Sequence, residues 1–233
     1  QLEHLIAQQL ENCGVDYFDY YMLHNVSGFT ETAWKNVDLY SFIENKKKII
    51  IDAGHGGFDG GASVGNTLEK DINLVIAKNL KCLISMFGYD IIMIRETDCA
   101  INTEGNSIRT KKISDMKNRL QIMKNYPEAE FVSIHLNKYT TSKPNGLQVF
   151  YSPNDERSLT LSKNIQGAVK EILQNENHRK VIKASKDTYL LYNAPIPAVI
   201  IECGFLSQKK QETEENTIFN TVSAVNSVLP EGA

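Results

Sequence analysis

The sequence predicts an α/β protein with a single, mostly parallel, twisted sheet and helices on both faces, preceded by a short N-terminal helix-strand extension. Two observations predict this class. Short apolar runs rich in β-branched residues alternate along the chain with stretches whose apolar residues recur every three or four positions. Strand and helix signals that alternate in this way are typical of a sheet wound by helical crossovers, which cover its faces.

The first elements follow from local pattern. Residues 49–52 are a β-branched run that enters the glycine-rich segment 53–57, as expected of a buried strand followed by a tight turn. Apolar residues within 72–87 then recur at helical spacing, and Gly88 is expected to end that helix. The next strand is predicted at residues 89–95.

The second half of the chain continues this alternation. Its predicted elements are a helix over 113–123 that stops before Pro127, strands over 131–136 and 146–151, and a helical face over 159–173. Two further apolar runs, 189–192 and 198–201, precede an acidic, helix-compatible tail that begins at Gln211.

Composition excludes several classes of protein. The chain has 233 residues, of which 42% are hydrophobic, and a formal net charge of −3 without a strong block of either sign. No nucleic-acid partner is expected, because such proteins carry basic patches. The apolar runs are far shorter than the roughly 20 residues of a membrane-spanning helix. The four cysteines lack a CxxC pair and are predicted to be mostly buried thiols.

We expect the chain to divide into an extra segment, residues 1–46, and a single α/β domain, residues 47–233. The extra segment begins with a helical pattern and continues with an aromatic-rich, strand-like run over 15–24. It starts at Gln1 with no recognisable export signal, so we expect a trimmed or processed sequence.

Ionisable residues follow or lie within three predicted strands. His55 follows the first strand, His135 lies inside residues 131–136, and Glu202 comes directly after residues 198–201. Glu69 lies where the first helix begins and can reach back over the same edge of the sheet. Because chemistry in wound sheets gathers at the carboxyl ends of strands, we expect these four side chains to meet.

These residue types suit a catalytic zinc site. Two imidazoles and a carboxylate, here His55, His135 and Glu69, leave a coordination position for water, and a second carboxylate such as Glu202 can take and return a proton. Each residue alone also fits a structural role, as a loop histidine, a core histidine or a buried ion-pair partner. A phosphate cradle is disfavoured, since a GxGxxG pattern begun at Gly54 would need glycine where Asp59 stands.

Four segments resemble the zinc-dependent N-acetylmuramoyl-L-alanine amidases of the Amidase_3 type, in family order. They are Ile50-Ile51-Asp52-Ala53-Gly54-His55-Gly56-Gly57, Leu68-Glu69-Lys70-Asp71-Ile72-Asn73-Leu74, Phe131-Val132-Ser133-Ile134-His135-Leu136-Asn137, and residues 197–207 around Glu202. The resemblance implies the phosphorylase/hydrolase-like α/β fold. It also implies His55, Glu69 and His135 as ligands of Zn²⁺ and Glu202 as the catalytic glutamate.

The reaction implied is hydrolysis of the amide between the lactyl group of N-acetylmuramic acid and L-alanine of the stem peptide in peptidoglycan. Residues 148–154 and 177–180 look most like the germination-specific, spore-cortex branch of the family. That resemblance implies an extracytoplasmic location, such as the cell wall or the forespore intermembrane space. It also allows for an accessory activator protein. Asn137 and Arg119 are candidates for substrate contact. Arg119, with Asp115 and Asn118, also fits an exposed helix face.

Two parts of the chain depart from this family. Ser207 is followed by Gln208-Lys209-Lys210 where the family commonly has Asn-Pro and an acidic residue, which leaves the boundary of the terminal helix open. Residues 13–25 resemble instead a fragment of an aldo/keto reductase in which His24 matches the active-site histidine. The other catalytic residues of that family are absent, so no nicotinamide cofactor is expected.

Three other functions compete with the amidase. One is a wall-binding module that keeps the fold without chemistry, and another is a zinc peptidase that cuts within the stem peptide. The third is an oxidoreductase, suggested only by residues 13–25. The presence of all four candidate residues, His55, Glu69, His135 and Glu202, favours the amidase.

Overall fold

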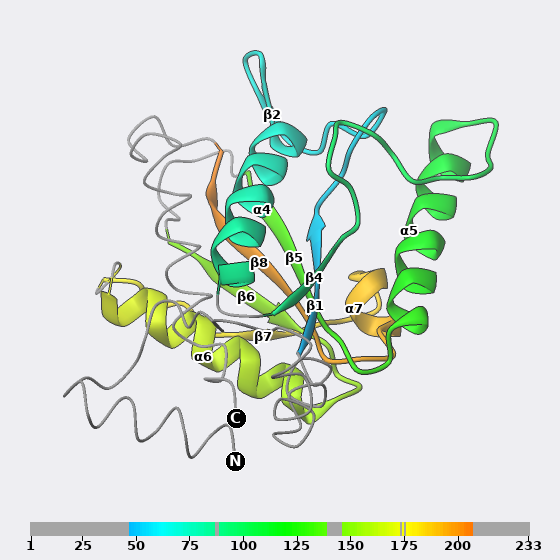
Figure 1. Ribbon diagram of the computed structural model, residues 1–233. Coiled ribbons are helices and arrows are strands. Elements are labelled where there is room, and N and C mark those ends of the chain that lie inside the picture. The colour runs from blue at the N-terminus through cyan, green and yellow to red at the C-terminus, as the bar shows by residue number, and fades with distance from the viewer. Residues whose placement is uncertain (1–46, 87–88, 139–145, 173, 175, 207–233) are drawn as a thin grey trace, which may run out of the picture.

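The computed structural model describes residues 47–86, 89–138, 146–172, 174 and 176–206. At its centre is a six-stranded sheet with the order β4-β1-β5-β8-β6-β7 (Figure 1). Strands β1 (Lys48–Ala53), β4 (Asp90–Met93), β5 (Glu130–Asn137) and β8 (Ala198–Phe205) are mutually parallel. The predicted mostly parallel sheet is therefore confirmed.

The remaining strands extend or flank this sheet. Strand β6 (Gln148–Tyr151) pairs antiparallel with β8, and β7 (Ile182–Lys183) pairs parallel with β6 at the edge. A separate two-stranded hairpin, β2 (Ser63–Val64) and β3 (Thr67–Leu68), connects the glycine-rich loop after β1 to the first described helix.

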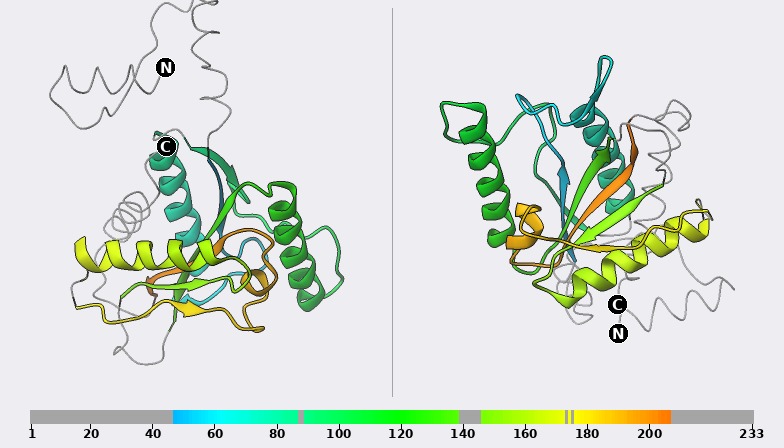
Figure 2. Two further views of the ribbon diagram at one scale, coloured as in Figure 1. Left: turned by 90° about the horizontal axis from the view of Figure 1, so that it is seen from below. Right: turned by 180° about the vertical axis from the view of Figure 1, so that it is seen from behind.

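Helices cover both faces of the sheet, as predicted (Figures 1 and 2). Helices α4 (Glu69–Met86) and α6 (Glu156–Ile172) contribute to one apolar core, which is the larger of the two. Helices α5 (Ile108–Asn125) and α7 (Tyr189–Asn193) pack into a second core on the opposite face. Adjacent β1 residues alternate between the two cores, because successive side chains of a strand point to opposite faces.

Local chemistry explains where two of the helices begin. Ser107 caps α5 by accepting a hydrogen bond from the backbone NH of Thr110, whose hydroxyl accepts in turn from the backbone NH of Ser107. Helix α4 begins with Glu69 and carries Asp71 in its first turn, where carboxylates interact favourably with the helix dipole.

The apolar run at residues 189–192, for which the sequence predicts no particular secondary structure, lies in a short helix. The structure differs from the sequence predictions at two points. Strand β8 continues to Phe205, so Glu202 lies inside a strand and not after its end. Of the cysteines that are described, Cys203 is buried while Cys82 is exposed and Cys99 is intermediate, so the prediction of mostly buried thiols is wrong.

Several predictions fall outside the described residues. They concern the extra segment at 1–46 with its reductase-like portion, the helix end at Gly88, and the chain from Ser207 onward. In the described part of the chain, no helix combines the length and apolarity needed to cross a membrane.

Candidate metal centre and active site

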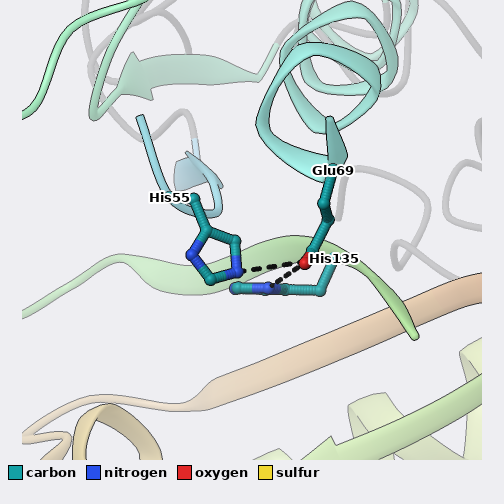
Figure 3. Close-up of side chains that lie close together, drawn as sticks. All are labelled: His55, Glu69 and His135. Atoms are coloured by element: carbon teal, nitrogen blue, oxygen red, sulfur yellow. Dashed lines mark hydrogen bonds and ion pairs between the residues drawn. The ribbon is translucent and has the colours of Figure 1, made fainter. Parts of the chain in front are cut away.

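Three side chains converge at the carboxyl edge of the sheet (Figure 3). His55 projects from the loop after β1, Glu69 is the first residue of α4, and His135 lies near the end of β5. Oε1 of Glu69 lies 3.0 Å from Nδ1 of His135 and 3.2 Å from Nε2 of His55. One potential ligand atom from each of the three residues lies within 4.8 Å of the others, so a single ion can be shared among them.

Close backbone approach makes this convergence possible. A Cβ atom at Gly54 would lie 2.2 Å from Cε1 of the His135 ring, and one at Gly61 would lie 2.5 Å from Oε2 of Glu69. Gly61 also has a φ of 66°, in the left-handed region that other residues rarely adopt. The glycine-rich loop therefore packs against these side chains with its backbone, because a side chain at either glycine would clash with them.

Asp59 orients the His55 ring. Its Oδ2 atom lies 3.0 Å from Nδ1 of His55, on the opposite side of the ring from Glu69. Asp59 is itself held by an ion pair of 2.8 Å with Lys112 on α5. A carboxylate on one ring nitrogen is the usual arrangement around metal-binding histidines, since it fixes the tautomer and leaves the other nitrogen for the ion.

The charges at this centre suit a cation. Burial disfavours protonated His55, but its hydrogen bonds to Asp59 and Glu69 outweigh burial and raise its pKa to about 9. Although burial raises the pKa of Glu69, its hydrogen bonds to His135 and His55 hold that pKa well below its ordinary value. Two carboxylates thus stabilise positive charge here, and the nitrogen and oxygen donors are those that zinc accepts.

Glu202 lies beside this group. It is the direct partner of His135 in the pairing of β8 with β5. Its Oε2 atom is buried and has no hydrogen-bond partner within the described residues. Burial raises the pKa of Glu202 above its ordinary value, against the effect of the His135 charge. A carboxylate with an unsatisfied oxygen and a raised pKa has the properties of a general base.

Arg119 does not lie where substrate contact would require. Its side chain is 1% exposed, and it forms ion pairs with Asp52 and Asp115. The guanidinium also donates to the backbone carbonyl of His55 at 3.0 Å. The prediction of substrate contact is therefore corrected, as is the alternative of an exposed helix face. Arg119 supports the loop that carries His55 from beneath.

Asn137 forms a hydrogen bond with its sequence neighbour, whereas Asn118 forms one with the loop that precedes α5. Asn137 is the last residue of β5, and its side-chain oxygen accepts a hydrogen bond from the backbone NH of Lys138. It is only partly buried, so its side chain is accessible, and we propose that it contacts the substrate. Asn118 on α5 donates to the carbonyl of Ile101, so it fastens the preceding loop.

Two supporting residues were not singled out from the sequence as parts of this centre. Asp59 stands four residues after His55, and this spacing within the glycine-rich loop could have indicated a local contact. Arg95, which follows β4, donates to the carbonyls of Ala53, Gly54 and Lys70 and so ties the loop to the start of α4. Nothing in the sequence near Arg95 points to that role.

Comparisons with known proteins agree with this geometry. Residues 49–220 match the Amidase_3 family model, described as N-acetylmuramoyl-L-alanine amidase. The germination-specific N-acetylmuramoyl-L-alanine amidase of Bacillus subtilis is 36% identical over 169 residues, which are 72% of this chain and 70% of that protein. The probable cell wall amidase LytH of Staphylococcus aureus is 30% identical over 172 residues, or 72% of this chain and half of LytH.

Solved structures give the same result. The CwlD amidase from Clostridioides difficile, determined in complex with the GerS lipoprotein, is similar with a TM-score of 0.74 and 39% identity over 80% of this chain and 98% of that one. An N-acetylmuramoyl-L-alanine amidase from Clostridium difficile 630 has a TM-score of 0.63 and 26% identity, covering 78% of this chain and 96% of the other.

Proposed function

The chain belongs to the Amidase_3 family of N-acetylmuramoyl-L-alanine amidases, and from this premise we propose how its own residues carry out the hydrolysis. The substrate is peptidoglycan, and the bond cleaved joins the lactyl group of N-acetylmuramic acid to L-alanine of the stem peptide. The observation that carries the proposal is the convergence of His55, Glu69 and His135 next to the unpartnered oxygen of Glu202. The catalytic domain is assigned to residues 47–233.

The proposed metal ligands are Nε2 of His55, Nδ1 of His135 and the carboxylate of Glu69, and the proposed ion is Zn²⁺. These atoms already face one another, and Asp59 engages the remaining nitrogen of His55. When bound, zinc polarises the scissile carbonyl and lowers the pKa of water from 15.7 towards about 7. His55, His135 and Glu69 hold the ion and leave room for substrate.

Glu202 is the proposed general base and acid. Its buried Oε2 accepts a proton from the attacking water, and the same carboxyl group then donates that proton to the departing alanine nitrogen. The raised pKa favours this second step, because a carboxylic acid that holds its proton longer can transfer it to the leaving group. Protonation of the nitrogen completes the cleavage.

The biological setting is proposed from the relatives. The Bacillus subtilis relative is germination-specific, so we place this amidase in spore-cortex maturation or germination. A peptidoglycan substrate implies action outside the cytoplasm, and the forespore intermembrane space is the proposed location. The solved CwlD is in complex with the GerS lipoprotein, which supports an accessory protein as a partner here as well.

The first test combines metal content with product analysis. Purified protein is assayed for zinc by elemental analysis and for release of peptides from peptidoglycan, with and without a chelator. We expect stoichiometric zinc and chelator-sensitive release of peptides that begin with L-alanine. If mass spectrometry instead located the cut within the stem peptide, the protein would be a peptidase. If zinc-replete protein released no peptide even in the presence of an accessory lipoprotein, an enzymatic role would be contradicted.

A further inference from the structure

The side chains on the face of the sheet that carries His135 form a row that extends across β8 to β6. Glu202 on β8 pairs with His135 on one side and with Gln148 on β6 on the other. Directly paired residues of neighbouring strands point to the same face of a sheet. His135, Glu202 and Gln148 therefore form one row, with the candidate metal centre at one end and Gln148 at the other.

Arg179 is fixed above the Gln148 end of this row. Nη2 of Arg179 donates a hydrogen bond to Oε1 of Gln148, and Nε2 of Gln148 donates to the carbonyl of Lys180. Asn177, which is 3% exposed, accepts from the backbone NH of Arg179 and donates to the carbonyl of Leu147. Both ends of the short segment around Arg179 are thus attached to β6 and to the residue before it.

A β-bulge supplies a ring beneath the guanidinium. In the pairing of β5 with β8, His135 faces Glu202 but Asn137 faces Phe205, so β8 contains one additional residue at this point. The extra residue places Phe205 on the same face as Glu202, although three positions separate them. The guanidinium carbon of Arg179 lies 5.1 Å from the centroid of the Phe205 ring, within the range of a cation–π contact.

Arg179 forms no direct ion pair with a carboxylate among the described residues, although its charge acts at longer range on Glu202 and lowers the pKa of that group against the effect of burial. The ion pairs recorded there include Arg119 with Asp52 and Asp115, but none of them contains Arg179. The side chain is only partly buried, so its remaining donors can be reached. The guanidinium is held by the Gln148 amide and the Phe205 ring and has further NH donors that are not used. Such a group can bind a planar anion, for example a carboxylate.

The direction of the reaction indicates which part of the substrate reaches Arg179. In the proposed mechanism the scissile carbonyl would face the centre formed by His55, Glu69 and His135, while Glu202 transfers a proton to the nitrogen of the peptide side. The peptide that continues from this nitrogen then passes Glu202 on the side away from the metal centre, which is where Gln148 and Arg179 lie.

We propose that Arg179, oriented by Gln148 and Phe205, is a subsite that binds a carboxylate of the stem peptide on the leaving-group side of Glu202. The inference rests on the proposed function, because it takes the position of the peptide from the roles given to Glu202 and the three ligands. It assigns to the amidase a preference for peptides that carry a free carboxylate near the scissile bond.

The test compares two ligands that differ in one group. The first is an N-acetylmuramoyl dipeptide whose second residue has a free α-carboxylate, and the second is the same dipeptide with a carboxamide at that position. Affinities for zinc-loaded protein are measured by calorimetry in the Glu202→Gln background, which prevents turnover. We expect the carboxylate ligand to bind about tenfold more tightly, the ratio that corresponds to about 1.4 kcal/mol.

Variants then locate the source of this preference. Arg179→Gln is expected to bind the two ligands equally, and Arg179→Lys to retain a reduced preference, because lysine keeps the charge but not the planar pair of donors. Arg157→Gln is the matched control, since Arg157 is paired with Asp155 and is close to Glu130 at the opposite end of β5. It is expected to leave the tenfold ratio unchanged.

Two results would overturn the subsite. One is that the protein with Arg179 intact binds both ligands with equal affinity. The other is that folded Arg179→Gln still binds the carboxylate ligand more tightly, by the same factor as the protein with Arg179 does. The first comparison needs no substitution at Arg179, so it remains decisive if that variant fails to fold. Peptide release from peptidoglycan is measured separately. Release without a carboxylate preference rejects the subsite alone. A carboxylate preference that depends on Arg179, without chelator-sensitive release, rejects the amidase mechanism and retains only the binding of a carboxylate by Arg179.

Discussion

The buried guanidinium of Arg119 donates a hydrogen bond of 3.0 Å to the backbone carbonyl oxygen of His55. His55 has a φ of 64°, a left-handed conformation that is uncommon outside glycine. The buried pairs of Arg119 with Asp52 and Asp115 hold the guanidinium in place. A proposed metal ligand in an unusual backbone conformation is thus supported by a charged cluster in the interior of the protein.

Removing Arg119 is expected to lower both stability and metal affinity. Arg119→Met leaves the buried carboxylates of Asp52 and Asp115 without their cation, a change that costs about 3–5 kcal/mol. Denaturant unfolding of the metal-free protein measures this loss. Arg157→Met, which breaks an exposed pair with Asp155, serves as the control and is expected to cost under about 1 kcal/mol. Equal losses in the two variants would contradict the structural role of Arg119.

Asp59→Asn is expected to weaken metal binding without unfolding the protein. It removes the carboxylate that fixes the His55 ring, and losses of such partners typically lower metal affinity by about 10- to 100-fold. Competition with a chromogenic chelator measures the affinity. Lys112→Met removes only the ion pair behind Asp59 and is the matched control. If both variants bound zinc as tightly as the original protein, Asp59 would have no orienting role.

Glu202→Gln is expected to separate turnover from metal binding. The glutamine keeps the shape of the side chain but cannot accept a proton, so kcat should fall by about 10²- to 10⁴-fold. Zinc content should be retained because Glu202 is not among the three proposed ligands. Glu96→Gln, at an exposed pair with Lys81, controls for loss of a carboxylate elsewhere. Near-normal turnover in Glu202→Gln would remove this residue from its assigned role.

Gly54→Ala is expected to abolish the metal site through a single methyl group. The added Cβ would lie 2.2 Å from the His135 ring, so the ring must move away from Glu69. Gly167→Ala on α6 introduces the same group where nothing lies within 4 Å, and alanine in a helix is favoured over glycine by about 1 kcal/mol. The expected pattern is a stable Gly167 variant with full zinc content and a Gly54 variant that elemental analysis finds depleted of zinc.

Zinc binding at pH 7 is expected to release about one proton. In the metal-free protein the pKa of His55 is raised to about 9, so its ring is protonated at pH 7 and must lose that proton to become a ligand. Because the pKa is raised, stabilisation by the protonated ring is complete below its ordinary value of 6.5 and is lost as pH rises through about 9. Calorimetry in buffers of different ionisation enthalpy counts the protons. If the number of protons released on zinc binding did not decline towards about pH 10, His55 would not be their source.

The fold was predictable because its strands and helices carry strong local signals. The β-branched run at residues 49–52 and the helical spacing within 72–87 are each visible without knowledge of their partners. The antiparallel direction of β6 was not predicted, because strand direction is decided by which strands meet in the sheet. The run at 189–192 is too short for its periodicity to distinguish a helix from a strand.

The candidate ligands were predictable for a different reason. His55 follows β1, Glu69 begins α4 and His135 lies near the end of β5, and parallel strands bring their carboxyl ends to one edge. The residues that support the ligands were harder to predict from the sequence. Arg119 has the sequence pattern of a polar helix residue, and only the packing of α5 against the sheet reveals that its charge is buried among carboxylates. Its spacing on the helix therefore could not identify its role.

The central position of β5 makes the order of chain synthesis matter. Its two neighbours are β1, which is made about 80 residues earlier, and β8, which is made about 60 residues later. Until β8 emerges from the ribosome, the strand that carries His135 has one open edge and Glu202 does not yet exist. With Glu202 in its proposed role, we expect a chain that ends before β8 to be unable to hydrolyse peptidoglycan, so activity would arise only when nearly all of the described chain has been translated.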